Sequence, residues 1–172
     1  MIFATIGSML PFDRLVQVVD GWSGEHPAQE VLIQLGQGQY VPRHAKWVRM
    51  MRPLEFNQSV ESCELMVAHL GMGSFITAMQ AGKPVILFPR SLALGEITSD
   101  HQRQAADWLR DKPGVWVADD ETALQGLLDA FCAGQLSVSP EVGSRSASNE
   151  LITHVRQFIH ESRGQKREHK GE

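Results

Sequence analysis

Short apolar runs alternate along the chain with segments in which apolar residues recur every three or four positions. The runs have the length and composition of buried strands, and we expect strands at 1–7, 30–36, 46–51, 64–71, 83–89 and 115–119. The recurring pattern predicts helices at 11–22, from about 57, and at 74–82, 100–112, 120–134 and 149–163. The polar, turn-rich stretch 135–148 predicts a loop.

Strands that alternate with helices predict βαβ units and a parallel sheet covered on both faces. We therefore expect an α/β fold with a single Rossmann-like parallel sheet and helices on both faces. The sequence shows no internal repeat, and one domain over residues 1–162 accounts for its length. Residues 163–172 contain no apolar side chain, so we expect a polar, flexible tail there.

The composition of the chain argues against several classes of function. The net charge of −4 argues against nucleic-acid binding, which needs a basic surface. The two cysteines, Cys63 and Cys132, lack metal-ligand spacing and fit a reducing compartment. No apolar run approaches the roughly 20 residues that span a bilayer, and the first residues lack the basic region of a signal peptide. We expect a cytoplasmic domain.

Glycine-rich loops follow the expected strands, where ligands bind in an open parallel sheet. In the segment 69–74, Gly71 and Gly73 allow a ligand to approach the backbone, and Ser74 stands where we expect a helix to begin. Such a helix start can hold phosphate, and His69 can add a hydrogen bond or a positive charge. A tight turn without a ligand is the alternative. The sequence contains neither the P-loop nor the dinucleotide-binding glycine pattern, which argues against those two classes of nucleotide site.

Several short motifs in a fixed order make the chain resemble glycosyltransferase family 28. They are Ala68-His69, Gly71, Gly73-Ser74, Gly82-Lys83-Pro84 and Asp100-His101-Gln102. The resemblance covers about residues 1–111 and implies the donor-binding C-terminal half of a GT-B glycosyltransferase. The chain resembles short members of the family, namely the smaller subunit of bacterial exopolysaccharide glycosyltransferase pairs and the catalytic subunit of the dolichol-pathway GlcNAc transferase, and the segment 89–102 is more similar to the bacterial kind.

The resemblance implies roles for particular residues. The donor diphosphate would lie against Gly7, Ser8, His69, Gly71, Gly73 and Ser74. The catalytic residues implied are His101 and Gln102, which would meet the donor sugar with Asp100 nearby. Uracil would lie against a loop around Leu54–Phe56, and Arg90 would help to stabilise the leaving diphosphate.

One position departs from the family pattern. Many members carry a glutamate that binds the ribose hydroxyls, where this chain has Thr77. A neutral threonine has one hydroxyl oxygen and cannot replace the two charged oxygens of a carboxylate. Ribose binding is then weaker, or another group such as Glu96 supplies it.

The resemblance also implies a reaction and a partner. A hexose would pass from a UDP-sugar, with inversion, to a polyprenyl-diphosphate-linked acceptor in exopolysaccharide or capsule biosynthesis. A membrane-anchored acceptor-binding subunit would supply most of the catalytic base and hold the chain at the inner face of the membrane. We expect no cofactor, and no metal requirement, because the helix start offsets the diphosphate charge. The alternatives are a non-catalytic nucleotide-sugar-binding or regulatory subunit and an epimerase-like fragment.

Overall fold

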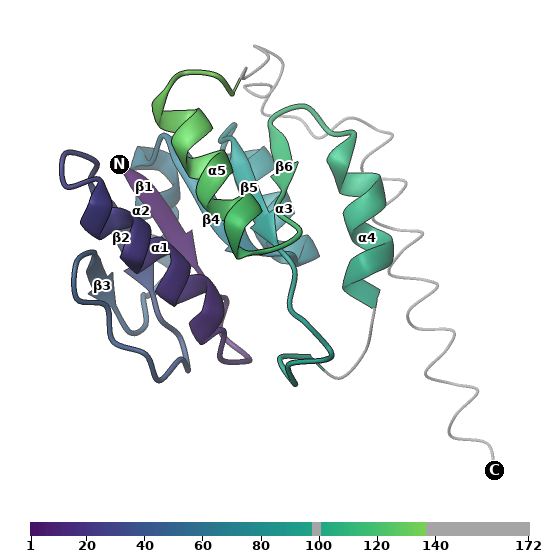
Figure 1. Cartoon of the computed structure of the whole chain (residues 1–172), viewed down its shortest axis with the longest axis horizontal. Helices are drawn as coiled ribbons and strands as arrows, with labels where there is room; N and C mark the ends of the chain where they lie inside the picture. The colour runs from purple at the N-terminus through teal and green to yellow at the C-terminus, as the bar shows by residue number, and fades with distance from the viewer. Residues whose placement is uncertain (98–100, 137–172) are drawn as a thin grey trace.

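The computed structural model describes residues 1–97 and 101–136, without the side chains of residues 101–105 (Figure 1). The expected last helix, the tail and Asp100 lie outside the described residues. All six expected strands are present, and they form one parallel sheet in the order β3-β2-β1-β4-β5-β6. They are β1 (Ile2–Thr5), β2 (Val31–Gln34), β3 (Lys46–Val48), β4 (Leu65–His69), β5 (Val85–Phe88) and β6 (Val115–Val117).

Helices cover both faces of the sheet, which confirms the expected Rossmann-like fold (Figure 1). They are α1 (Asp13–Glu25), α2 (Pro53–Ser62), α3 (Met72–Gln80), α4 (His101–Arg110) and α5 (Glu121–Cys132). On one face, α1 and α5 bury Trp22 and Leu124 against side chains such as Ile33. On the other, Phe75 of α3 and Leu109 of α4 pack with Phe3. The two faces take alternate residues of each strand, so strands buried on both sides read as continuous apolar runs.

Helix α2 begins four residues earlier than the sequence pattern predicted. It starts at Pro53, whose missing N–H and fixed φ suit the first position of a helix. A capping box reinforces this start, because the Glu55 carboxylate accepts a hydrogen bond of 3.0 Å from the Arg52 backbone N–H. The expectation of a loop around Leu54–Phe56 is therefore wrong, since these residues form the first turn of α2.

Helix α3 also begins earlier than expected. Gly71 is its N-cap residue, and Ser74 occupies the third helical position, so the prediction that the helix begins at Ser74 is wrong. The other end agrees with the prediction. Gly82 follows the helix with a φ of +64°, and the Lys83 N–H bonds to the Ala78 carbonyl across the turn.

A buried carboxylate holds the long connection between β2 and β3. Asp20 of α1 is completely buried, and its two oxygens accept hydrogen bonds from the backbone N–H groups of Arg43, His44 and Ala45, each 2.9 Å long. The Tyr40 hydroxyl donates a fourth, 2.8 Å long. Burial alone would raise the pKa of Asp20, but these hydrogen bonds outweigh it and hold the pKa below its usual range.

Candidate functional site

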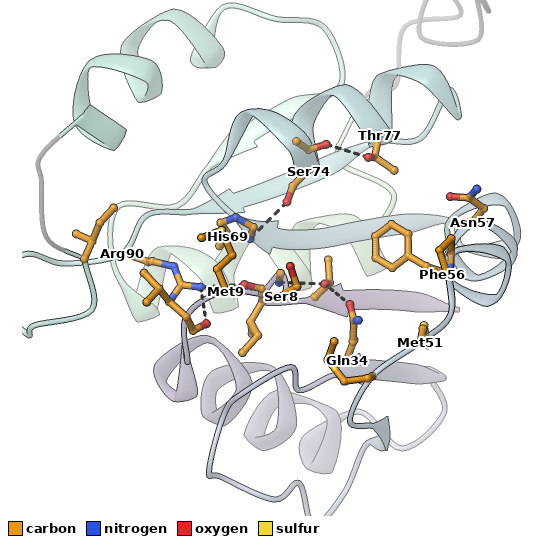
Figure 2. Close-up of a pocket in the computed structure, with 18 residues that line it drawn as sticks. Ser8, Met9, Gln34, Met51, Phe56, Asn57, His69, Ser74, Thr77 and Arg90 are labelled. Carbon is orange, nitrogen blue, oxygen red and sulfur yellow. Dashed lines mark hydrogen bonds between the residues drawn. The ribbon is translucent and has the colours of Figure 1, made fainter. Parts of the chain in front are cut away.

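A cleft with a cavity volume of about 650 Å³ opens at the carboxyl edge of the sheet (Figure 2). Its walls come from the β1–α1 loop, the start of α2, the start of α3 and the β5–α4 segment. In Figure 2, Arg90 lies on one side of the cleft, while Met51, Phe56 and Asn57 lie on the opposite side. The cleft therefore joins a cationic end to an apolar end, as a ligand with a charged group and a ring would require.

The His69 ring is held between two glycines. A Cβ atom on Gly7 would stand 2.7 Å from His69 Cε1, and one on Gly71 would stand 2.5 Å from His69 Nε2. Gly7 also has a φ of +78°, which other residues rarely adopt. We expected both glycines to admit a ligand. Each of them makes room for the His69 side chain, and of the two only Gly7 is among the residues that line the cleft.

Gly73 behaves differently from these two glycines. It lies in the first turn of α3 and lines the cleft, and a Cβ atom there would meet nothing within 4 Å. The fold itself therefore does not require a glycine at this position. Since the N-cap residue Gly71 has no side chain, no cap shields the first N–H groups of α3, which carry partial positive charge. An uncapped helix start of this kind suits an anionic ligand.

His69 is uncharged at neutral pH. Burial first, and then the positive charge of Arg90, lower its pKa to about 4. The expectation that His69 could bring a positive charge is therefore wrong, and the alternative of a hydrogen bond remains. Its Nδ1 atom lies 3.4 Å from the Ser74 hydroxyl (Figure 2).

We predict that the His69 ring titrates near pH 4, well below the usual value of about 6.5. Because the folded protein resists this protonation, stability should fall as pH drops from 6.5 towards 4. Side-chain carbon–proton NMR spectra recorded from pH 7 to pH 3.5 would follow the ring, and the missing signal in His69→Gln would assign it. A midpoint above pH 6 would contradict the prediction.

Arg90 lines the cleft, but much of its guanidinium is used within the protein. It is buried and donates hydrogen bonds to the carbonyls of Ile6 (2.8 Å), Leu10 (3.0 Å) and Pro11. The guanidinium also lies over the Phe12 ring, 4.6 Å from its centroid. Arg90 therefore fixes the β1–α1 loop, which forms part of the cleft wall.

A second arginine fixes the β5–α4 segment. The Arg14 guanidinium binds both carboxylate oxygens of Glu96, at 2.9 and 2.8 Å, and the Pro89 carbonyl at 2.9 Å. Glu96 also accepts the Ser91 N–H at 2.7 Å. Glu96 is not among the residues that line the cleft. Its two oxygens already accept hydrogen bonds from Arg14 and Ser91, so the structure does not support the alternative that Glu96 binds the ribose.

The structure brings most of the expected site residues together. Gly7, Ser8, Phe56, His69, Gly73, Ser74, Thr77 and Arg90 line the cleft. The Thr77 hydroxyl donates its proton to the Gly73 carbonyl, 2.8 Å away, so only its lone pairs face a ligand. His101 and Gln102 begin α4, with side chains outside the described part, and Asp100 lies outside it entirely.

Thr5 and Gln34 are among the lining residues that sequence reasoning missed. They are paired in register at the carboxyl ends of β1 and β2. The Thr5 hydroxyl donates a hydrogen bond of 2.7 Å to Gln34 Oε1 and accepts one of 3.2 Å from the Gly7 N–H. The sequence does contain a feature that could have identified them: each of two buried apolar strands ends in a polar residue.

Six exposed apolar side chains of the described residues lie on the segments that form the walls of the cleft, and three of them, Met9, Leu10 and Met50, line it. The six are Met9 and Leu10 after β1, Met50 and Leu54 after β3, and Leu92 and Leu94 after β5. Between 43% and 82% of the surface of each residue is exposed. We call these six residues the apolar rim. Apolar patches beside a ligand site are typical of surfaces that meet another molecule.

Residues 1–133 match the glycosyltransferase family 28 C-terminal domain. No curated protein is significantly similar to the chain. No helix of the described residues is long and apolar enough to cross a bilayer.

Solved structures share the fold at low sequence identity. ALG13 is 19% identical over 81% of this chain and 88% of its own, with a TM-score of 0.57. The kitacinnamycin glycotransferase is 16% identical over 84% of this chain, with a TM-score of 0.60, and the chain spans only 36% of its length. The UDP-GlcNAc 2-epimerase from Neisseria meningitidis, bound to UDP-GlcNAc, is 13% identical over 91% of this chain and 43% of its own, with a TM-score of 0.55.

Proposed function

The chain belongs to glycosyltransferase family 28, whose C-terminal domain it matches, and from this premise we propose that it is the UDP-sugar-binding, catalytic subunit of a two-chain inverting glycosyltransferase. The observation that carries the proposal is the open start of α3. Gly73 lines the cleft in the first turn of this helix, no side chain caps the helix, and the fold does not need a glycine at this position. A diphosphate suits such a seat.

The other parts of a UDP-sugar extend from this seat. In this proposal the uracil ring lies against Phe56 at the apolar end of the cleft, and Ser8 and Ser74 bond to diphosphate oxygens. His101 and Gln102 hold the donor sugar, with Asp100 nearby, as the family resemblance implies. Thr77, where many members have a glutamate, offers the ribose only lone pairs. The bound UDP-GlcNAc in the structurally similar epimerase belongs to the same class of ligand.

The proposed reaction is a displacement at the anomeric carbon. The acceptor hydroxyl oxygen forms the new bond, the bond to the diphosphate breaks with inversion, and a base takes the hydroxyl proton. The N–H groups of α3 stabilise the charge that develops on the departing UDP, so we propose that no metal ion is required. In this proposal most of the base function comes from the second chain.

The apolar rim supports the proposal of a partner. Its residues lie on the segments that form the walls of the cleft, and an acceptor-binding chain would have to face the donor bound there. We propose a membrane-anchored, acceptor-binding subunit that presents a polyprenyl-diphosphate-linked saccharide in exopolysaccharide or capsule biosynthesis. The chain would then act at the cytoplasmic face of the membrane.

Calorimetric titration tests the donor site directly. The full chain would be titrated with UDP, UDP-glucose, UDP-glucuronate, UDP-galactose and UDP-GlcNAc, each with and without Mg²⁺. We expect UDP to bind equally well in both conditions, and the tightest UDP-sugar to indicate the donor. The absence of UDP binding, both by the lone chain and by the co-expressed pair, would contradict the proposal. Binding only with Mg²⁺ would contradict the metal-free site.

A non-catalytic, regulatory subunit is the second candidate, because Thr77 stands where many family members carry the glutamate that binds the ribose hydroxyls. Transfer assays on the co-expressed pair separate the two candidates. If the chain is catalytic, His101→Ala and Gln102→Ala should each abolish transfer without breaking the pair. Unchanged transfer in both variants would favour the regulatory candidate.

A further inference from the structure

The amide of Gln34 is a buried polar group with unused donors. Only 6% of the Gln34 surface is exposed, yet the residue lines the cleft. Its oxygen accepts the Thr5 hydroxyl proton at 2.7 Å, whereas no group of the described residues bonds to its nitrogen. Among those residues no fully buried side-chain nitrogen or oxygen lacks a partner, so the Gln34 nitrogen must be accessible from the cleft. Its two N–H groups are therefore free to donate hydrogen bonds to a ligand in the cleft.

Thr5 fixes the direction of this amide. The Thr5 hydroxyl accepts the Gly7 N–H and donates its only proton to Gln34 Oε1 (Figure 2). Thr5 is itself buried, and the two residues are paired in the sheet register. Because the oxygen of the amide is held on the Thr5 side, the nitrogen is held on the other side. The donor group is thus preorganised before a ligand arrives.

The surroundings of Gln34 determine which part of a ligand it can meet. Met50, Met51 and Phe56 line the same cleft, and Figure 2 shows Gln34 nearer to Met51 than to Arg90. Apolar side chains suit the faces of a planar ring, and a neutral amide suits a neutral acceptor on its edge. The charged phosphates belong instead at the start of α3.

We infer that the Gln34 amide donates a hydrogen bond to a carbonyl oxygen of the uracil base, and so selects the nucleotide of the donor. The inference rests on the proposed function and adds a specificity-determining residue to it. A site built to donate this bond rejects a base that lacks the acceptor, because the buried amide is then left unpaired. Adenine has no carbonyl oxygen, so ADP is the informative competitor.

Titrations of the full chain with UDP and with ADP test the inference. In Gln34→Leu, UDP should bind about tenfold more weakly, while ADP should bind as well as before or more tightly, because the variant has no amide to leave unpaired. Gln34→Glu keeps the shape but turns an acceptor oxygen towards the base, so UDP binding should weaken further. Gln80→Leu, at an exposed position near the end of α3, is the matched control and should bind both as the unchanged chain does.

Thr5→Val provides a second, independent measurement. This change keeps the side-chain shape and removes the hydroxyl that orients the amide, so UDP should bind a few-fold more weakly. The double variant Thr5→Val/Gln34→Leu should bind UDP no more weakly than Gln34→Leu alone, since Thr5 acts through Gln34.

The outcomes separate the inference from the proposed function. If the unchanged chain binds UDP and Gln34→Leu binds it equally well, the inference fails and the proposed function stands. An equal loss of UDP and ADP in a folded Gln34→Leu also overturns it, because the amide would then not read the base. If neither the unchanged chain nor the co-expressed pair binds UDP, the proposed function fails and the inference falls with it.

Discussion

Gly73→Ala is expected to weaken UDP binding strongly while leaving the fold intact. The added methyl group meets no protein atom within 4 Å, but it stands in the cleft at the start of α3. Crowding a close contact costs about 1–3 kcal/mol, which corresponds to roughly 5- to 150-fold in affinity. Alanine is also the better helix former, so the free energy of unfolding should stay the same or rise by up to about 1 kcal/mol.

Gly126→Ala is the matched control for this prediction. Gly126 lies in α5, and a Cβ atom there also meets nothing within 4 Å, but the residue does not line the cleft. Gly126→Ala should raise the free energy of unfolding as Gly73→Ala does, but it should not weaken UDP binding. Calorimetric titration and denaturant unfolding of both variants give the comparison. Unchanged UDP affinity in Gly73→Ala would remove the start of α3 as the diphosphate seat.

Asp20→Asn should cause a large loss of stability. The carboxylate accepts four hydrogen bonds in a fully buried position, and an amide offers one acceptor oxygen and turns an NH₂ group towards backbone donors. Leaving buried donors unpaired costs about 1–3 kcal/mol each, so we expect the free energy of unfolding to fall by about 3 kcal/mol. Urea unfolding of the variant and the unchanged chain measures this difference.

The difference in stability between the unchanged chain and Asp20→Asn should decrease as the pH falls. The folded protein holds the pKa of Asp20 below its usual range, so its contribution is present above the unfolded pKa of about 3.9 and is lost as pH falls through the folded value. The gap between the unchanged chain and Asp20→Asn should therefore narrow between pH 7 and pH 3. Asp107→Asn, at an exposed position in α4, should change stability by less than about 0.5 kcal/mol. A gap that is constant with pH would contradict this explanation.

The fold could be predicted from the sequence because a parallel sheet buries both faces of its strands. Each strand then reads as an apolar run, as at 85–88, and each helix as a periodic pattern. Helix starts were harder to predict. Ser74 has the chemistry of an N-cap, but the His69 ring requires a glycine at position 71, and that glycine begins the helix.

The candidate site could be predicted from the sequence only in part. The loop pattern located the cleft, but it assigned a ligand to Gly71, whose space is taken by a side chain. The charge of His69 depends on its burial and on Arg90, which lies 21 residues further along the chain. Gln34 was missed because its role comes from its neighbour Thr5 on the next strand. These properties arise from three-dimensional contacts that no local pattern contains.

The place of β1 at the centre of the sheet has a consequence for biosynthesis. Ile2 pairs with Val31 on one side and with Leu65 on the other, so the first strand to be made needs partners 29 and 63 residues later. At a synthesis rate of about 5–20 residues per second, β1 leaves the ribosome roughly 3–13 s before its second partner. During that interval its apolar residues depend on chaperones or on local collapse. Slowing translation before residue 65 should therefore lower the yield of folded chain more than slowing it after residue 117.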